Sequence, residues 1–155
     1  YFGEGVLLEN RHLDRKKISD IVFQDAKKRK KLEGFIHPRI QMEFIKQVED
    51  ISCANPSAII QVAVPLLIEV NMQRLFHKII VVYISMDRQI ERLMKRDGIS
   101  RAAAIKILDA QMHIDEKLTH ADYIIKNEGS IEETRTQVED LWRKLVRLQE
   151  ERCRR

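Results

Sequence analysis

Three arginines in the middle of the chain could bind phosphate groups. Arg92 and Arg96 lie four residues apart in a helical pattern, so their side chains share one face, and Arg101 follows closely. A guanidinium is always charged and offers a planar set of N–H donors that matches phosphoryl oxygens. In phosphoryl transfer such a group neutralises charge developing on the γ-phosphate. The alternative is a solvent-facing helix on which Arg92 pairs with a local carboxylate, Asp87 or Glu91.

A histidine next to a proline marks a second candidate. Pro38 is favoured in the first turn of a helix, which we expect to run to about residue 51. His37 would then stand beside free backbone N–H groups, which can hold a phosphate or a pantetheine-type group. The alternative is a histidine that only caps the turn.

The apolar run at residues 58–64 should place further candidates. Continuous apolar residues are typical of a strand buried on both faces of a parallel sheet, and Pro65 should end it. In open α/β sheets, ligands bind outside the carboxyl ends of the strands. Pro65, Leu66 and Glu69 are therefore candidates to line a site. The alternatives are a core strand that leads to no ligand and a salt bridge at Glu69.

Two more strands are expected at residues 78–84 and 121–126, both rich in Ile and Val. The first is separated from residues 58–64 by enough chain for a crossover, so these two strands should be parallel. Asn127 and Gly129 follow the last strand and could present backbone atoms to a base, or form only a turn. Alternating strands and helices predict a parallel α/β fold.

Helix-capping residues predict the helices that position these groups. Asp14 should cap residues 15–24, Ser85 a helix that ends at Gly98, and Ser100 residues 102–112. A further short helix should cover residues 115–120. A capping box at Ser130 opens a long amphipathic helix.

Composition excludes several classes of protein. The chain has 155 residues, 44% of them hydrophobic, with a net charge of +4, which suits one folded domain. No apolar run is long enough for a membrane helix, and Cys53 and Cys153 lie far apart without metal-ligand spacing, so we expect a reduced cytoplasmic protein. Residues 27–31 are all basic, which is typical of a solvated helix face or of a nucleic-acid patch.

An ordered series of short motifs resembles bacterial dephospho-CoA kinase over nearly the whole chain. Its members are FG at Phe2, LDR at Leu13, HPRI at His37, VPLLIE at Val64, QIERLMKRDGIS at Gln89, AQ at Ala110, EKL at Glu116, AD at Ala121 and N-x-G-S at Asn127. Each is weak alone, but the order is specific. PLL-x-E followed by ERL-x-x-RD is the strongest part.

The resemblance implies a P-loop kinase fold, a three-layer α/β/α arrangement with a helical substrate-binding insertion and a lid. It implies transfer of a phosphoryl group from ATP to the 3′-hydroxyl of dephospho-CoA, the last step of coenzyme A synthesis. On this basis residues 1–55 supply the acceptor-binding helices, residues 58–84 core strands, residues 86–120 the lid region, and residues 121–155 the last strand and helix of one domain. Arg92 and Arg96 would act on the phosphates, and Asn127 and Gly129 would lie near the adenine.

One departure from the family qualifies this expectation. The sequence contains neither the G-x-x-x-x-G-K-[ST] loop, which cradles phosphates and binds Mg²⁺, nor the acidic motif after it. It looks like the family with its first quarter and first strands absent, so we expect little catalysis from these residues alone, with the Mg²⁺ ligands upstream. One alternative is a non-catalytic module that binds CoA or a nucleotide or that interacts with a partner. The other is a basic nucleic-acid-binding domain. The oligomeric state is open.

Overall fold

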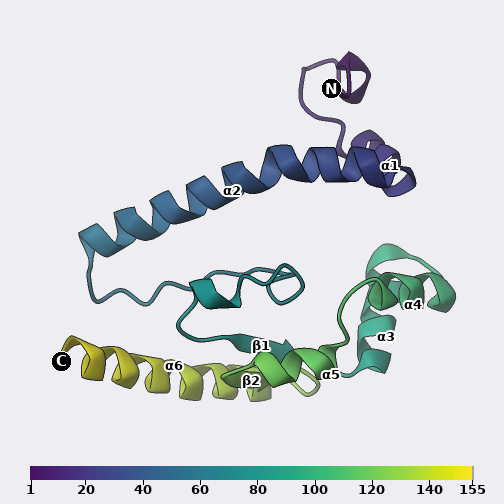
Figure 1. Ribbon diagram of the computed structural model, residues 1–155. Coiled ribbons are helices and arrows are strands. Elements are labelled where there is room, and N and C mark those ends of the chain that lie inside the picture. The colour runs from purple at the N-terminus through teal and green to yellow at the C-terminus, as the bar shows by residue number, and fades with distance from the viewer. Residues whose placement is uncertain (155) are drawn as a thin grey trace. The chain divides into compact units, whose positions relative to one another are not determined.

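The computed structural model describes residues 1–154, and the chain divides into two compact units, Tyr1–Ile60 and Gln61–Arg155. The first unit contains η1 (Glu4–Val6), α1 (Arg15–Gln24) and α2 (Ala26–Ala54), as Figure 1 shows in purple and blue. The second contains η2 (Gln73–Leu75), β1 (Ile80–Tyr83), α3 (Met86–Asp97), α4 (Arg101–Asp109), α5 (Ile114–Lys117), η3 (Leu118–His120), β2 (Tyr123–Lys126) and α6 (Ile131–Cys153).

The first unit is a pair of helices, α1 and α2, that contact each other. The Asp14 carboxylate accepts a hydrogen bond of 3.0 Å from Lys17 N, which confirms the predicted cap of α1. The predicted start of a helix at Pro38 is wrong, because Pro38 lies inside α2. Asp25 caps α2 much earlier, and the helix continues through Pro38 even though a proline there removes one intrahelical hydrogen bond and crowds the preceding turn.

The second unit contains a parallel sheet of β1 and β2, so the predicted α/β class is confirmed. The register pairs Ile80 with Tyr123 and Tyr83 with Lys126. Each strand contributes one residue to the core, Val81 and Ile125. Further buried residues in this unit come from the turn before η2 and from three helices: Ile68, Ile90, Ala104 and Leu141.

The predicted strand at residues 58–64 is wrong, and with it the expected parallel pairing to residues 78–84. The chain there is irregular, and residues 65–70 form turns. A strand needs a neighbour to satisfy its backbone groups, and within residues 1–154 β1 and β2 pair only with each other. An apolar run predicts burial, but it does not supply a partner strand.

The remaining helices follow the sequence signals closely. Helix α3 ends at Gly98, whose φ of 65° is the left-handed conformation that glycine adopts without strain, and α3 packs against α4. Helix α6 lies beside β2 and begins at Ser130. In the part of the chain that is described, no helix combines the length and the apolar character that crossing a bilayer requires.

Candidate functional site

The carboxyl ends of β1 and β2 lie side by side, and the candidate site is built around them. Tyr83 pairs with Lys126 at the end of the ladder, and Asn127 N donates a 2.8 Å hydrogen bond to Tyr83 O. Two helices begin at this edge: α3 directly after Ser85, and α6 directly after Ser130. Parallel strands thus bring two turns and two helix starts together, which is where open α/β sheets bind ligands.

Arg92 reaches this edge from α3. Its Nη2 donates a 3.0 Å hydrogen bond to the backbone oxygen of Asn127. The two carboxylates suggested as its structural partners pair with other arginines, since Asp87 contacts Arg101 at 2.8 Å and Glu91 contacts Arg88 at 3.5 Å. A guanidinium has five N–H donors, so one bond to a carbonyl leaves donors for an incoming phosphate.

Arg96 behaves differently from Arg92. Its guanidinium makes two hydrogen bonds to the neighbouring Asp97 carboxylate, at 2.7 and 2.8 Å, and its side chain is 72% exposed. Arg101, the third arginine of the predicted group, is paired with Asp87. Of the three arginines, only Arg92 contacts the turn after β2.

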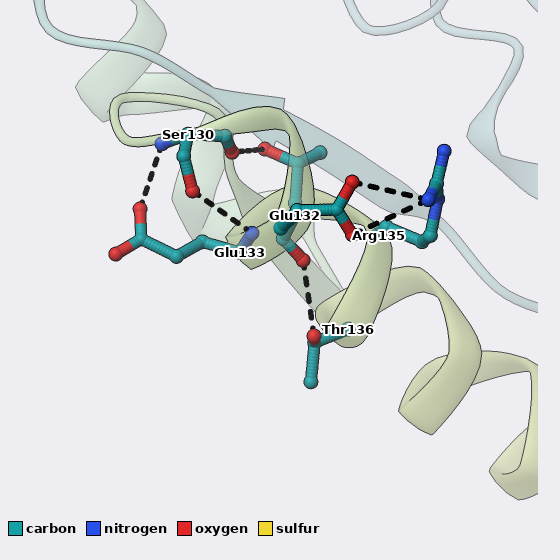
Figure 2. A network of polar contacts seen from close by, with 6 residues as sticks. Ser130, Glu132, Glu133, Arg135 and Thr136 are labelled. Atoms are coloured by element: carbon teal, nitrogen blue, oxygen red, sulfur yellow. Dashed lines mark hydrogen bonds and ion pairs between the residues drawn. The ribbon is translucent and has the colours of Figure 1, made fainter.

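The turn after β2 is held by the start of α6. Asn127 Oδ1 accepts a 3.4 Å hydrogen bond from the hydroxyl of Thr134. Figure 2 shows the capping box that follows: Glu133 N donates to Ser130 Oγ at 3.2 Å, and Ser130 N donates to Glu133 Oε2 at 2.7 Å. A side chain at Gly129 would put its Cβ only 1.8 Å from Glu133 Oε2. Glycine at this position therefore leaves room for the cap that orders the turn.

Glu128 was not predicted from the sequence, yet it connects the two helix starts. Its Oε1 accepts a 2.9 Å hydrogen bond from Ser85 N, whereas the Ser85 side chain makes no capping bond to α3. Hydrogen bonds from Ser85 lower the pKa of Glu128, with smaller contributions from the charges of Lys126 and Arg88. The sequence shows only that a carboxylate follows Asn127. It does not show the partner of that carboxylate, Ser85, which lies 43 residues earlier in the chain.

Glu69 is tied to the segment that follows α4. Its Oε1 lies 2.6 Å from Lys117 Nζ and accepts a longer bond, 3.3 Å, from Met112 N. Burial raises the pKa of Glu69, but the hydrogen bond and charge of Lys117 and the backbone N–H groups outweigh it and lower the pKa. Its Oε2 is buried without a hydrogen-bond partner. Glu69 therefore forms a salt bridge here, as one alternative anticipated.

Pro65 and Leu66 lie at the start of the 65–70 turns, and both are exposed. Val70 N donates to Leu66 O at 3.1 Å, so this turn is closed by its own backbone. Their predicted place at the exit of a strand is wrong, because residues 58–64 form no strand. Their role in binding substrate stays a prediction.

His37 and Pro38 lie in the first unit, on the exposed surface of α2. The argument that placed them beside the free N–H groups of a helix start is wrong, because α2 begins at Ala26. The basic residues 27–31 occupy the exposed first turns of the same helix. Several have local partners: Lys28 pairs with Asp25, Arg29 with Glu33, and Lys31 Nζ lies 5.2 Å from the centre of the Phe35 ring.

Two hollows are found in the second unit, and the predicted site residues line neither. One, of about 540 Å³, lies between Asn71, Gln73, Arg74 and His120. The other, of about 40 Å³, lies between α3, α4 and α5. Within residues 1–154, no three His, Cys, Asp or Glu side chains gather as metal ligands.

A family model, two relatives and a solved structure that match this chain carry the name of one family. The family model described as dephospho-CoA kinase matches residues 1–133. A relative from Bacillus licheniformis named dephospho-CoA kinase is 39% identical over 90% of this chain and 69% of its own length. One from Syntrophus aciditrophicus with the same name is 38% identical over 94% of this chain and 62% of its own length. The structure of dephospho-CoA kinase from Campylobacter jejuni matches with a TM-score of 0.68 at 33% identity, over 92% of this chain and 70% of that one.

Proposed function

The chain belongs to the dephospho-CoA kinase family, and on this premise we propose that the protein transfers the γ-phosphoryl group of ATP to the ribose 3′-hydroxyl of dephospho-CoA. In that reaction the bond from the γ-phosphorus to its bridging oxygen breaks as a bond to the 3′-oxygen forms. ADP leaves, the hydroxyl proton is released, and CoA is the product.

The observation that carries the proposal is the position of Arg92. Its guanidinium lies at the carboxyl edge of a parallel sheet and is bonded to the turn at Asn127. Charge neutralisation by a positioned arginine is one of the main contributions that proteins make to phosphoryl transfer. We assign Arg92 to the ATP phosphates and the turn at Asn127 and Gly129 to the adenine. Arg96 stays a candidate for the same phosphates, although two of its five N–H donors are bonded to Asp97.

The acceptor side of the proposal rests on family membership more than on geometry. We propose a role in binding dephospho-CoA for His37 and Pro38 in the first unit and, as a separate assignment, for Pro65, Leu66 and Glu69 in the second unit. For Glu69 the structure adds a constraint, because its carboxylate already holds Lys117 and Met112 N. A direct role in binding substrate would require that salt bridge to open.

The test is an assay of the full-length protein with ATP, Mg²⁺ and dephospho-CoA, with CoA measured as product. We expect Arg92→Ala to lower kcat by about 10²- to 10³-fold, the range for the loss of one group that stabilises charge in the transition state. Arg143→Ala is the matched control, because Arg143 forms only a surface pair with Asp140 on α6. An Arg92→Ala enzyme as fast as the control would remove Arg92 from the mechanism.

A second candidate is a module that binds ligand without catalysis. The printed residues contain no G-x-x-x-x-G-K-[ST] motif, and that loop contacts the phosphates and Mg²⁺ in P-loop kinases. For the same reason we propose that residues 1–155 by themselves bind ATP weakly and transfer little. Calorimetry separates the candidates: binding of dephospho-CoA without binding of ATP by the full-length protein favours the module, and turnover in the assay above excludes it.

A further inference from the structure

Two neighbouring residues of one turn hold α3 at two points. After β2, Asn127 O accepts a hydrogen bond from Arg92, and Glu128 Oε1 accepts one from Ser85 N. Ser85 and Arg92 are seven residues apart, which is two helical turns, so both contacts lie on the same side of α3. Two contacts on one side restrict both the position and the rotation of a helix relative to the turn.

The contact at Ser85 satisfies the backbone N–H of the N-cap residue of α3, the bond that an N3 carboxylate makes in a capping box. Ser85 is the N-cap residue of α3, but its side chain makes no capping hydrogen bond. The Glu128 carboxylate approaches the same end of the helix, where unpaired N–H groups and the helix dipole favour a negative charge. A residue from another part of the chain thus takes the place of the N3 side chain of a capping box.

We propose that Glu128 is a positioning residue for the reaction: it fastens the first turn of α3 to the turn after β2 and so sets where Arg92 meets the nucleotide. The proposal rests on the proposed function, because it assumes that Arg92 acts on ATP. Glu128 itself needs no contact with substrate. Its effect passes through the helix that it caps.

The main experiment is a double-mutant cycle in the full-length protein with Glu128→Ala and Arg92→Ala. If Glu128 acts through Arg92, Glu128→Ala lowers kcat/KM for ATP by about tenfold in the wild-type background, the range for one hydrogen bond to a charged group, and by less than twofold when Arg92 is already alanine. KM for dephospho-CoA should change less than twofold. Effects that multiply independently would overturn the proposal.

Two further variants separate positioning from a general loss of stability. Glu128→Gln keeps an oxygen that can accept from Ser85 N, so it should recover most of the activity lost in Glu128→Ala. Glu132→Ala is the matched control, because Glu132 is a nearby carboxylate whose side chain pairs with Arg135. An equal loss in Glu128→Gln and Glu128→Ala, or in the control, would contradict the role assigned to the Ser85 contact.

A measurement independent of turnover keeps this inference apart from the proposed function. In Glu128→Ala, the exchange of the Ser85 amide hydrogen measured by NMR should speed up about tenfold, because its acceptor is gone. The side-chain N–H signals of Arg92 should broaden or shift as its bond to Asn127 O weakens. If the wild type shows no kinase activity but these changes occur, the proposed function and the catalytic role of Glu128 fail, whereas the attachment of α3 by Glu128 stands. Unchanged Ser85 exchange would refute the inference even in an active enzyme.

Discussion

The Glu69–Lys117 salt bridge gives a stability prediction that the structure makes quantitative. The two charged atoms are 2.6 Å apart, and the side chains are only 20% and 14% exposed. Lys117→Met keeps most of the aliphatic stem but leaves a half-buried carboxylate whose remaining donor, Met112 N, is at 3.3 Å. A charge-assisted hydrogen bond contributes about 1.5–3 kcal/mol, and water can reach part of this site, so we expect a loss of about 2 kcal/mol.

The assay is urea or thermal unfolding of the full-length protein at neutral pH. For a chain of this length, about 2 kcal/mol corresponds to a fall in Tm of about 4–8 °C. Lys144→Met is the matched control, since Lys144 is exposed on α6. Combining Lys117→Met with Glu69→Gln should cost less than the sum of the single variants, because no charge is then left unpaired.

The dependence on pH distinguishes a salt bridge from simple packing. The folded-state pKa of Glu69 is lowered, so the stabilisation by the pair is complete above the unfolded value of about 4.3 and is lost as the pH falls through the folded value. In Lys117→Met no positive charge offsets the cost of burying the Glu69 carboxylate, and protonation in acid removes that cost. The gap in stability between wild type and variant should therefore narrow in acid. A gap that stays constant from neutral pH to about pH 3 would refute this explanation.

Three smaller predictions concern single contacts. Gly129→Ala should push Glu133 out of the capping box and lower stability by about 1 kcal/mol, measured by urea unfolding, because one of the two capping bonds is lost. Asp122→Ala should lower stability by about 1 kcal/mol, read from the same curves, because Asp122 accepts a hydrogen bond from Ile79 N at 2.8 Å. Its ion pair with Lys78 adds little, since solvent at the 34% exposed Asp122 side chain screens it. Gly98→Ala should cost about 1 kcal/mol and fray the end of α3 in amide exchange, because φ at Gly98 is 65°.

Helix starts were the features most predictable from the sequence. The caps at Asp14, Ser100 and Ser130 form as expected, each accepting a hydrogen bond from the amide three residues ahead. The cap predicted at Ser85 is wrong, because the Ser85 side chain makes no capping bond. A cap depends on groups within one turn of chain, so the sequence alone contains almost everything that decides it. Pro38 shows the limit of such local rules, because the helix that contains it begins well before it, at Ala26.

The contacts that hold the candidate site together could not be predicted in the same way. Lys117 lies 48 residues after Glu69, and Glu128 lies 43 residues after Ser85. Periodicity identifies the face of a helix on which Arg92 lies, but it does not say which turn that face meets. Long-range pairs become predictable only when the order and the register of the strands are known.

The register of β1 and β2 explains which residues meet beyond the ends of the two strands. Because Tyr83 pairs with Lys126, residues that follow β1 by one or two positions must lie beside residues that follow β2 by one or two positions. Ser85 and Glu128 are each two residues beyond their strand, so their contact is a direct consequence of this pairing. A shift of one residue would move Glu128 away from the start of α3 and turn the strand's side chains to the opposite face of the sheet. The geometry of the candidate site is therefore as specific as the register of its two strands, and the apolar residues that bury Val81 and Ile125 also determine where Arg92 meets the turn.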